Sequence, residues 1–129
     1  MTLSFLTNTT QVTNLALYAI AQHYIPRLQA LAKSQPNAKP SLLVTNSHLP
    51  WDPIPQLLSL SLAKAAQHNM VTSFSRAYGD SGVHFGLISV QGIVSPDAKV
   101  LNPKSIADKT WEFFDGSKEL QVQIQEPSS

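Results

Sequence analysis

The stretch SLLVTNSHLPWDPIPQLLSLSLAKAAQ, from Ser41 to Gln67, decides which fold the chain is expected to adopt. Its first part, Ser41–Asn46, is a short run of Leu and Val bounded by a proline and a polar turn, which predicts a buried strand. A proline-rich loop follows, and a strongly apolar helix then begins at Ile54 or Gln56 and ends near Tyr78. A polar turn directly after such a strand lies where open α/β sheets place their chemistry.

The rest of the chain continues this alternation of helices and strands. Gln11–Lys33 has apolar residues near helical spacing and predicts a helix, with its caps among residues 8–10. A kink or break is expected near Tyr24, because Pro26 lies inside this helix. Three elements follow the apolar helix, in the order strand, helix, strand: Val83–Val90, Pro103–Phe114 and Glu119–Gln125. The expected buried side of the last helix consists of Ile106, Ala107, Thr110, Trp111 and Phe114.

The order helix, strand, helix, strand, helix, strand predicts an α/β protein. Each helix is long enough to return the chain to a parallel neighbouring strand, and such connections are expected to be right-handed. We therefore expect part of a doubly wound parallel sheet with three layers. With 129 residues, the chain is expected to form a single domain over residues 1–129.

The composition is that of an ordinary globular protein and excludes several classes of function. Hydrophobic residues make up 43% of the chain, and the mean hydropathy is −0.06. The net charge is only +1 and the Lys and Arg residues are scattered, so nucleic-acid binding is not expected. The chain has no Cys, which excludes disulfides and thiolate zinc sites and favours a cytoplasmic location. No apolar run is long enough for a membrane span, and the first residues lack the features of a signal peptide.

Residues of the central stretch resemble the short-chain dehydrogenase/reductase family. In that family a catalytic Ser ends a strand, and about thirteen positions later a helix carries Tyr-x-x-x-Lys, often followed by two Ala. Ser47, Lys64 and the pair Ala65–Ala66 match this pattern, but the position of the Tyr holds Leu60. The resemblance implies a Rossmann-like fold and an NAD(P)-dependent oxidoreductase activity on a carbonyl or alcohol.

Three further positions match the family's pattern. Asn14 stands where the family has an Asn that anchors a water near the Lys; taken alone, it is a polar residue of an exposed helix face. The family usually reads Pro-Gly-x-Val after its next strand, and this chain keeps Gly92 and Val94 with Gln91 in place of the Pro. The resemblance implies these site residues: Ser47, Lys64 and Asn14 for catalysis, and Lys64, Gly92 and Val94 for the cofactor.

The resemblance runs from Thr10 to about Gln125 and corresponds to the C-terminal half of the family's fold. The glycines of the chain form no Gly-rich turn after a strand, so no pyrophosphate site is expected within it. The strand Ser41–Asn46, central in the family, would then be an uncharged edge with unpaired backbone groups. Three arrangements follow: Met1–Leu6 folds over this edge, a second chain pairs with it, or the product is a truncated remnant.

Other candidate chemistry has plainer explanations. Leu60 has no ionisable group, so the family's proton transfer cannot take place there. Ser47, His48 and Asp52 belong to one turn without the motif of a hydrolase nucleophile, and a polar turn is the better interpretation. The histidines lack the spacing of metal ligands, so we expect no metal site. The tyrosines are interpreted as packing residues.

Two functions follow from these patterns. The first is a truncated, short-chain-dehydrogenase-like protein without independent catalysis and without a cofactor in isolation. It would associate with itself or with a partner through helices 11–33 and 54–78, or through the edge of strand 41–46. The resemblance supports the helices, because the corresponding helices of the family pack against their copies in a dimer. The alternative is an NAD(P)-dependent oxidoreductase acting on a carbonyl or alcohol, with the missing half supplied by another chain.

Overall fold

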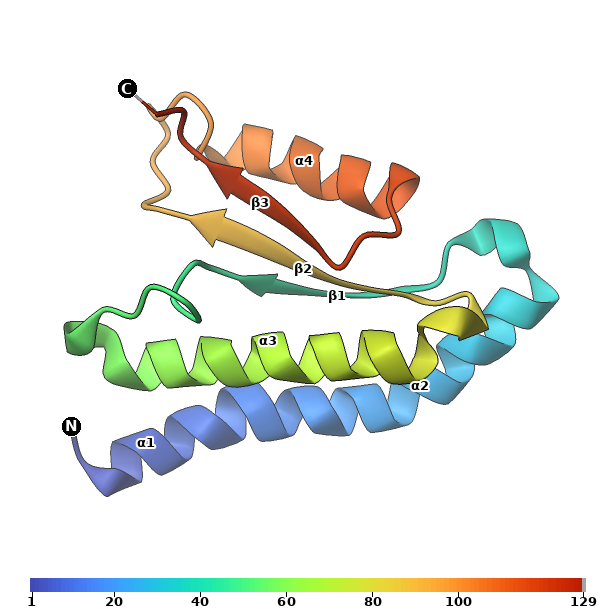
Figure 1. The fold of residues 1–129 in the computed structure, drawn as a ribbon, viewed down its shortest axis with the longest axis horizontal. Coiled ribbons are helices and arrows are strands. Elements are labelled where there is room, and N and C mark those ends of the chain that lie inside the picture. Colours follow the sequence, from blue (N-terminus) through green and yellow to red (C-terminus); the bar gives the residue numbers. More distant parts are fainter. Residues whose placement is uncertain (129) are drawn as a thin grey trace.

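Three parallel strands form the middle layer of the protein in the order β1-β2-β3. Their bounds are Ser41–Asn46 for β1, His84–Gln91 for β2 and Gln121–Gln125 for β3. In the computed structural model, which describes residues 1–128, helices cover both faces of this sheet (Figure 1). Helices α2 (Ala16–Ser34) and α3 (Leu58–Tyr78) lie on one face, and α4 (Pro103–Gly116) lies on the other. The predicted three-layer, partial doubly wound arrangement is confirmed.

The two connections within the sheet have opposite hands. The strands follow one another across the sheet in sequence order, while α3 and α4 lie on opposite faces (Figure 1). Both connections move the chain by one strand in the same direction across the sheet, one over each face. Two such connections have opposite hands, so the prediction that all connections are right-handed is wrong for one of them. The segment between β2 and α4, residues 92–102, is long enough to carry the chain round to the other face.

The first helix begins earlier than predicted. Helix α1 (Leu3–Thr10), a π-helical turn (Gln11–Leu15) and α2 follow one another without interruption. Thr2 caps α1 by accepting a hydrogen bond from the backbone N–H of Phe5 at 3.1 Å, so the caps predicted among residues 8–10 are wrong. The hydroxyls of Thr7, Thr9 and Thr10 instead donate to carbonyls one turn back, which a helix interior allows.

Helix α2 continues through Pro26, so the break considered near Tyr24 does not occur. Proline removes one backbone donor from the turn in which it lies. In that turn the guanidinium Nη1 of Arg27 donates to the carbonyl oxygen of His23 at 2.8 Å, which provides a side-chain hydrogen bond next to the missing one. Within the described part of the chain, no helix is long and apolar enough to cross a membrane.

The core consists of two clusters, one on each face of β2. Phe85 and Leu87 face α2 and α3, where they join Ala21, Ile25, Val71 and Val83. Ile88 faces the opposite way and joins the cluster under α4, whose other buried members are Leu101, Phe113 and Ile124. Alternation along a strand sends successive side chains to opposite faces, so one strand serves both clusters.

Helix α4 buries only part of the side that was predicted: Ile106 packs against the core cluster and Thr110 and Phe114 are half-buried, whereas Ala107 and Trp111 are exposed. Asn102 caps it as expected, with its side chain accepting from the backbone N–H of Ser105 at 2.9 Å. Phe113 is the buried aromatic residue at 4% exposure, whereas Trp111 is 64% exposed. A side chain on Gly86 would place Cβ 2.6 Å from the ring of Phe113, so the bare backbone of Gly86 makes room for this ring. Sequence spacing could not distinguish the two overlapping apolar stripes of the helix.

Strand β1 is an edge of the sheet, since β2 alone pairs with it among residues 1–128. Met1–Leu6, which was expected as one possible cover for this edge, instead leads into and forms the first part of helix α1, and α1 packs against α3 (Figure 1). The first of the three arrangements expected for the edge is therefore not adopted.

We predict that Gly86→Ala lowers the free energy of unfolding by about 1–3 kcal/mol, because the added methyl group overpacks the contact with Phe113 and Leu43. Gly116→Ala is the matched control. A side chain at Gly116 would meet nothing within 4 Å, so this change should be neutral or slightly stabilising. Urea denaturation of both variants tests the prediction, and equal midpoints would contradict it.

Candidate functional site

Polar side chains from three elements meet at the carboxyl end of β1. The strand ends at Asn46, which is 4% exposed, and Ser47 begins the following turn. Helix α3 packs against this end and contributes Lys64 and Gln67. The π-helical turn before α2 also contacts α3 and contributes Asn14. The structure thus brings Asn14, Ser47 and Lys64 to one region of the molecule.

Lys64 is bound to the strand rather than free in solvent. Its Nζ donates to the backbone oxygen of Thr45 at 3.1 Å and to Oε1 of Gln67 at 3.4 Å. In the other direction, Nδ2 of Asn46 donates to the backbone oxygen of Lys64 at 3.0 Å. Partial burial lowers the pKa of Lys64 below its ordinary value, because removal from water disfavours the charged amine. Helix and strand are therefore joined by hydrogen bonds in both directions.

Asn14 lies in the π-helical turn and is only 7% exposed, so its interpretation as a residue of an exposed helix face is wrong. The neighbouring carbonyl oxygen of Thr13 accepts a hydrogen bond from Nε2 of Gln67 at 3.0 Å. Turns of this kind are rare and often lie at functional sites. Gln67 therefore connects this turn to Lys64, and through Lys64 to the end of β1.

Sequence reasoning missed both Gln67 and the backbone of Thr45. A signal for Gln67 was present, because a Gln stands three residues after Lys64 on the side of α3 that otherwise carries Ala63 and Val71. A buried amide on an apolar helix face needs hydrogen-bond partners, which marks it as part of a polar contact. No sequence signal identifies the carbonyl of Thr45.

Ser47 closes a turn. Its Oγ accepts from the backbone N–H of Leu49 at 3.2 Å, and its own N–H donates to Oδ1 of Asn46 at 2.7 Å. His48 and Asp52 approach each other only to 3.9 Å, between Nε2 and Oδ2. Across residues 1–128, no hydrogen bond connects the Ser47 hydroxyl to His48 or to Lys64. These contacts fit the polar-turn interpretation and not a hydrolase triad.

Leu60 lies one turn before Lys64 and lines an apolar groove of about 760 Å³ between α1 and the start of α3. The groove also has Met1, Phe5, Leu57 and Leu58 in its walls. Leu60 is 39% exposed, so this position has an apolar side chain where the pattern of the short-chain dehydrogenase/reductase family has a Tyr hydroxyl. The groove therefore offers apolar contact without a proton donor at this position.

Gly92 and Val94 follow the carboxyl end of β2, next to the end of β1. Gly92 has a φ of 142°, and a Cβ there would lie 2.7 Å from Cδ1 of Leu101, so backbone geometry and packing account for the glycine. Val94 is exposed. Gly92 lies at the start of the long segment between β2 and α4, and among the described residues no glycine-rich turn leads directly from a strand into a helix, so these residues do not fit a complete dinucleotide site.

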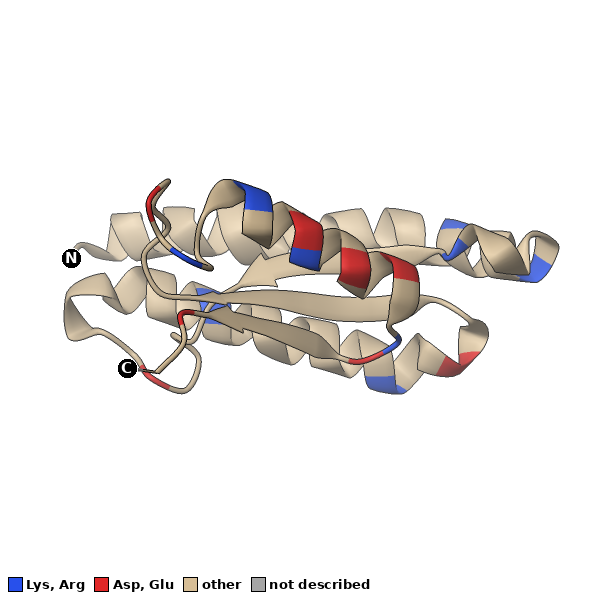
Figure 2. Ribbon diagram, turned by 90° about the horizontal axis from the view of Figure 1, so that it is seen from above, with Lys and Arg blue, Asp and Glu red and all other residues tan. Residues whose placement is uncertain are grey.

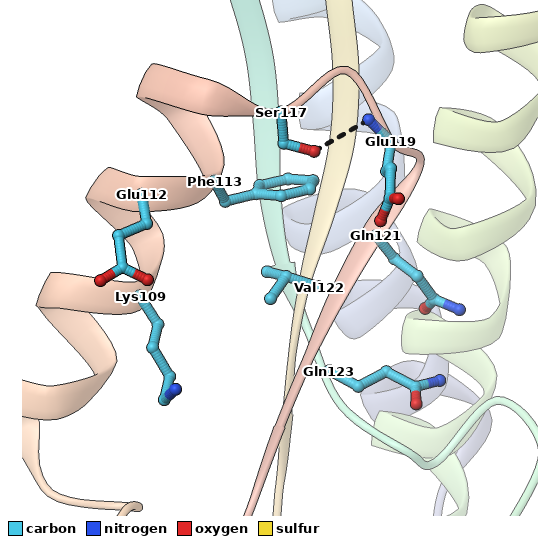
Figure 3. Close-up of a pocket in the computed structure, with 8 residues that line it drawn as sticks. All are labelled: Lys109, Glu112, Phe113, Ser117, Glu119, Gln121, Val122 and Gln123. Atoms are coloured by element: carbon cyan, nitrogen blue, oxygen red, sulfur yellow. Dashed lines mark hydrogen bonds between the residues drawn. The ribbon is translucent and has the colours of Figure 1, made fainter.

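A second hollow, of about 440 Å³, lies between α4 and β3 (Figure 3). Lys109 and Glu112 line it from α4, and β3 lines it with Val122 and with Gln121 and Gln123, whose side chains extend away from α4 (Figure 3). Its one hydroxyl is that of Ser117, whose Oγ accepts a hydrogen bond from the backbone N–H of Glu119 at 3.0 Å (Figure 3), so it belongs to a local turn and is not paired with a side-chain base. The described residues also contain no group of three His, Cys, Asp or Glu that could hold a metal ion. The carboxyl end of β1 thus remains the candidate site.

No protein-family model and no curated protein matches this chain. Solved structures do match it. The bulky-bulky ketone specific alcohol dehydrogenase from Comamonas testosteroni has a TM-score of 0.72 at 16% identity, over 95% of this chain and 46% of that chain. The NADH-dependent reductase A1-R' responsible for alginate metabolism has a TM-score of 0.75 at 12% identity, over 95% of this chain and 56% of that one. The same reductase complexed with NAD gives 0.73 at 13% identity, over 95% and 54%.

These matches show the fold. The chain spans about half the length of the dehydrogenase and reductase structures and has the same Rossmann-like arrangement of strands and helices over that part. The resemblance found in the sequence is therefore supported at the level of the fold.

We predict that Gln67→Leu lowers the free energy of unfolding by about 1–3 kcal/mol, because the Thr13 carbonyl loses its side-chain donor in a partly buried position. Asn69→Leu, an exposed amide on the same helix, is the matched control and should change the free energy by no more than about 0.5 kcal/mol. Chemical denaturation measures both values. If the two variants were equally stable, the hydrogen bond between Gln67 and the Thr13 carbonyl would not contribute to stability.

Proposed function

We propose that this chain is a non-catalytic association module with a short-chain-dehydrogenase-like fold, acting as one domain over residues 1–129. It pairs with a second copy, or with a related chain, through the outer faces of α1, α2 and α3, which include the predicted helices 11–33 and 54–78. The observation that carries this proposal is the number of large apolar side chains exposed on these helices. A cytoplasmic location, expected from the absence of Cys, is part of the proposal.

The exposed apolar residues are concentrated on the layer formed by the long helices. On α1, α2 and the turn between them they are Leu3, Phe5, Val12, Leu15, Tyr18, Ile20 and Tyr24. On α3 they are Leu58, Leu60, Leu62 and Tyr78. Tyr18 and Tyr24 are about half exposed, at 49% and 50%, and Tyr78 lies 6.3 Å from the Phe85 ring between centroids, so all three combine packing with exposure as amphipathic residues do. A concentration of exposed apolar side chains on one layer favours an interaction site.

Charge is nearly absent from the same layer. Figure 2 shows acidic and basic residues along α4, whereas α1, α2 and α3 are uncharged over most of their length. The first acidic residue of the chain is Asp52, and α1 and α2 together carry only Arg27 and Lys33. Depletion of charge together with exposed aromatic and aliphatic side chains is the composition of an interface core.

We predict that the purified protein is a dimer at micromolar concentration and that Leu62→Asp raises its dissociation constant about 30-fold or more, because a carboxylate would be buried in an apolar contact. Trp111→Asp is the matched control, since Trp111 is equally apolar and 64% exposed but lies on α4. It should leave the dimer intact. Sedimentation velocity at several concentrations distinguishes the results, and a wild-type monomer would rule out self-association.

A second candidate is an NAD(P)-dependent oxidoreductase acting on a carbonyl or alcohol. It is favoured by the position of Lys64 at the carboxyl end of a strand, in the fold of an NADH-dependent reductase that has been solved with NAD. A nicotinamide cofactor would supply the hydride transfer. The described residues provide neither a phosphate-binding turn nor an acid at Leu60, so this candidate requires another chain to complete the site.

We predict that millimolar NADPH does not raise the melting temperature of the isolated chain and that Leu60→Tyr does not produce NADPH oxidation with a panel of aldehydes and ketones. The physical reason is that restoring a hydroxyl does not restore a pyrophosphate site. A ligand that binds the native state must raise the midpoint by mass action. An upward shift would therefore move the oxidoreductase candidate ahead of the association module.

A further inference from the structure

The outer edge of β1 exposes the backbone groups of alternate residues. His84 N–H donates to the carbonyl oxygen of Pro40 at 2.9 Å, at the start of a regular parallel ladder from Ser41 to Asn46. Backbone groups alternate in direction along a strand, so residues 42, 44 and 46 point toward β2. The N–H and C=O groups of Ser41, Leu43 and Thr45 therefore point away from β2, along the free edge.

Lys64 occupies one end of this free edge. Its Nζ donates to the oxygen of Thr45, the last of the outward-pointing carbonyls. The strand itself, SLLVTN, contains no charged residue, so the ammonium is a single positive charge beside an otherwise neutral edge. The edge was expected to be uncharged with unpaired backbone groups, but at its carboxyl end a Lys from α3 pairs with one of these groups and protects the edge.

We propose that the free edge of β1 is a docking site for an extended segment of another polypeptide that carries a carboxylate opposite Lys64. A backbone N–H of the docked segment would donate to the carbonyl oxygen of Thr45 and replace the hydrogen bond that the ammonium group of Lys64 makes with it. That ammonium is partly removed from water, so an acidic side chain stabilises it better than a neutral one. The docked segment adds a fourth parallel or antiparallel strand to the sheet.

A second copy of the chain is a poorer occupant than an acidic segment. Strand β1 and the whole chain before it contain no Asp or Glu, so a second β1 cannot supply the carboxylate. This inference uses the edge of the sheet and not the outer faces of α1, α2 and α3. It is therefore independent of the proposed dimer, and Leu62→Asp should not affect it.

The test uses three fluorescein-labelled peptides and fluorescence anisotropy. The first alternates Thr and Val around one central Glu, the second has Lys in place of the Glu, and the third is the first with N-methyl groups on alternate residues. The Glu peptide should bind the wild-type protein about tenfold more tightly than the Lys peptide, as expected for hydrogen bonds to a charged group. The N-methylated peptide should not bind, because it cannot pair with the edge.

Three variants assign the binding to this edge. Lys64→Met should reduce the preference for Glu over Lys to less than about twofold, whereas Lys64→Arg should preserve it. Thr45→Pro should abolish binding while leaving the fold intact by circular dichroism, because the N–H that it removes points away from β2. Amide resonances of Ser41, Leu43 and Thr45 should shift in the wild-type protein on titration with the Glu peptide.

Any of four results would overturn the proposal. In the first, the Glu peptide fails to bind the wild-type protein at millimolar concentration. In the second, the Lys peptide binds as tightly as the Glu peptide. In the third, the Glu peptide binds the Thr45→Pro variant as tightly as the wild-type protein. In the fourth, the Lys64→Met variant self-associates and does not bind the Glu peptide. The role of Lys64 would then be only to protect the edge from a second copy.

Discussion

The burial of β2 is the constraint on which the rest of the structure depends. This strand is hydrogen-bonded along both edges and covered on both faces, and its residues from His84 to Ser89 are all buried. A backbone from which water is excluded must pair its polar groups, so β1 and β3 are required on either side. Phe85 and Leu87 need the helices α2 and α3, whereas Ile88 and Gly86 need α4. The three layers and the opposite hands of the two connections follow from these needs.

The position of Lys64, at the end of β1, is compatible with a catalytic role and with a structural role. Lys64 stands where the resemblance implies a catalytic Lys, yet its contacts are a strand carbonyl and the amide of Gln67. Gln67 in turn is bound to the π-helical turn that contains Asn14. The same residues that suggest chemistry therefore hold two helices and a strand together. A shared fold with dehydrogenases at 12–16% identity does not decide between these roles.

Two surfaces of the protein are of a kind that an isolated domain normally covers. The outer layer of α1, α2 and α3 exposes Leu and Tyr side chains with few charges, while α4 carries a mixture of Lys, Asp and Glu (Figure 2). The edge of β1 exposes backbone groups and one ammonium. The two proposed contacts, one between helices and one between strands, use different surfaces of the protein.

The sequence by itself determined the type and order of the elements. Strand Ser41–Asn46 has the predicted bounds, and the strands near Val83–Val90 and Glu119–Gln125 differ from prediction by at most two residues at either end. Short apolar runs bounded by turns predict strands, and the longer amphipathic segments that separate these runs predict helices, so the order of the elements can be predicted from the sequence. The helix that begins at Leu3 was missed because its threonines are typical of caps and turns when read without their carbonyl partners.

Only the tertiary structure decided which of several compatible contacts form. Phe113 and not Trp111 enters the core because Gly86, distant in sequence, leaves space for its ring. Asn14 is buried because α3 lies across its turn, and Lys64 reaches the carbonyl of Thr45 because the ladder with β2 turns that carbonyl to the free edge. Such contacts join residues far apart in the chain. Local patterns restrict which elements form, whereas the side that each one presents depends on the packing between them.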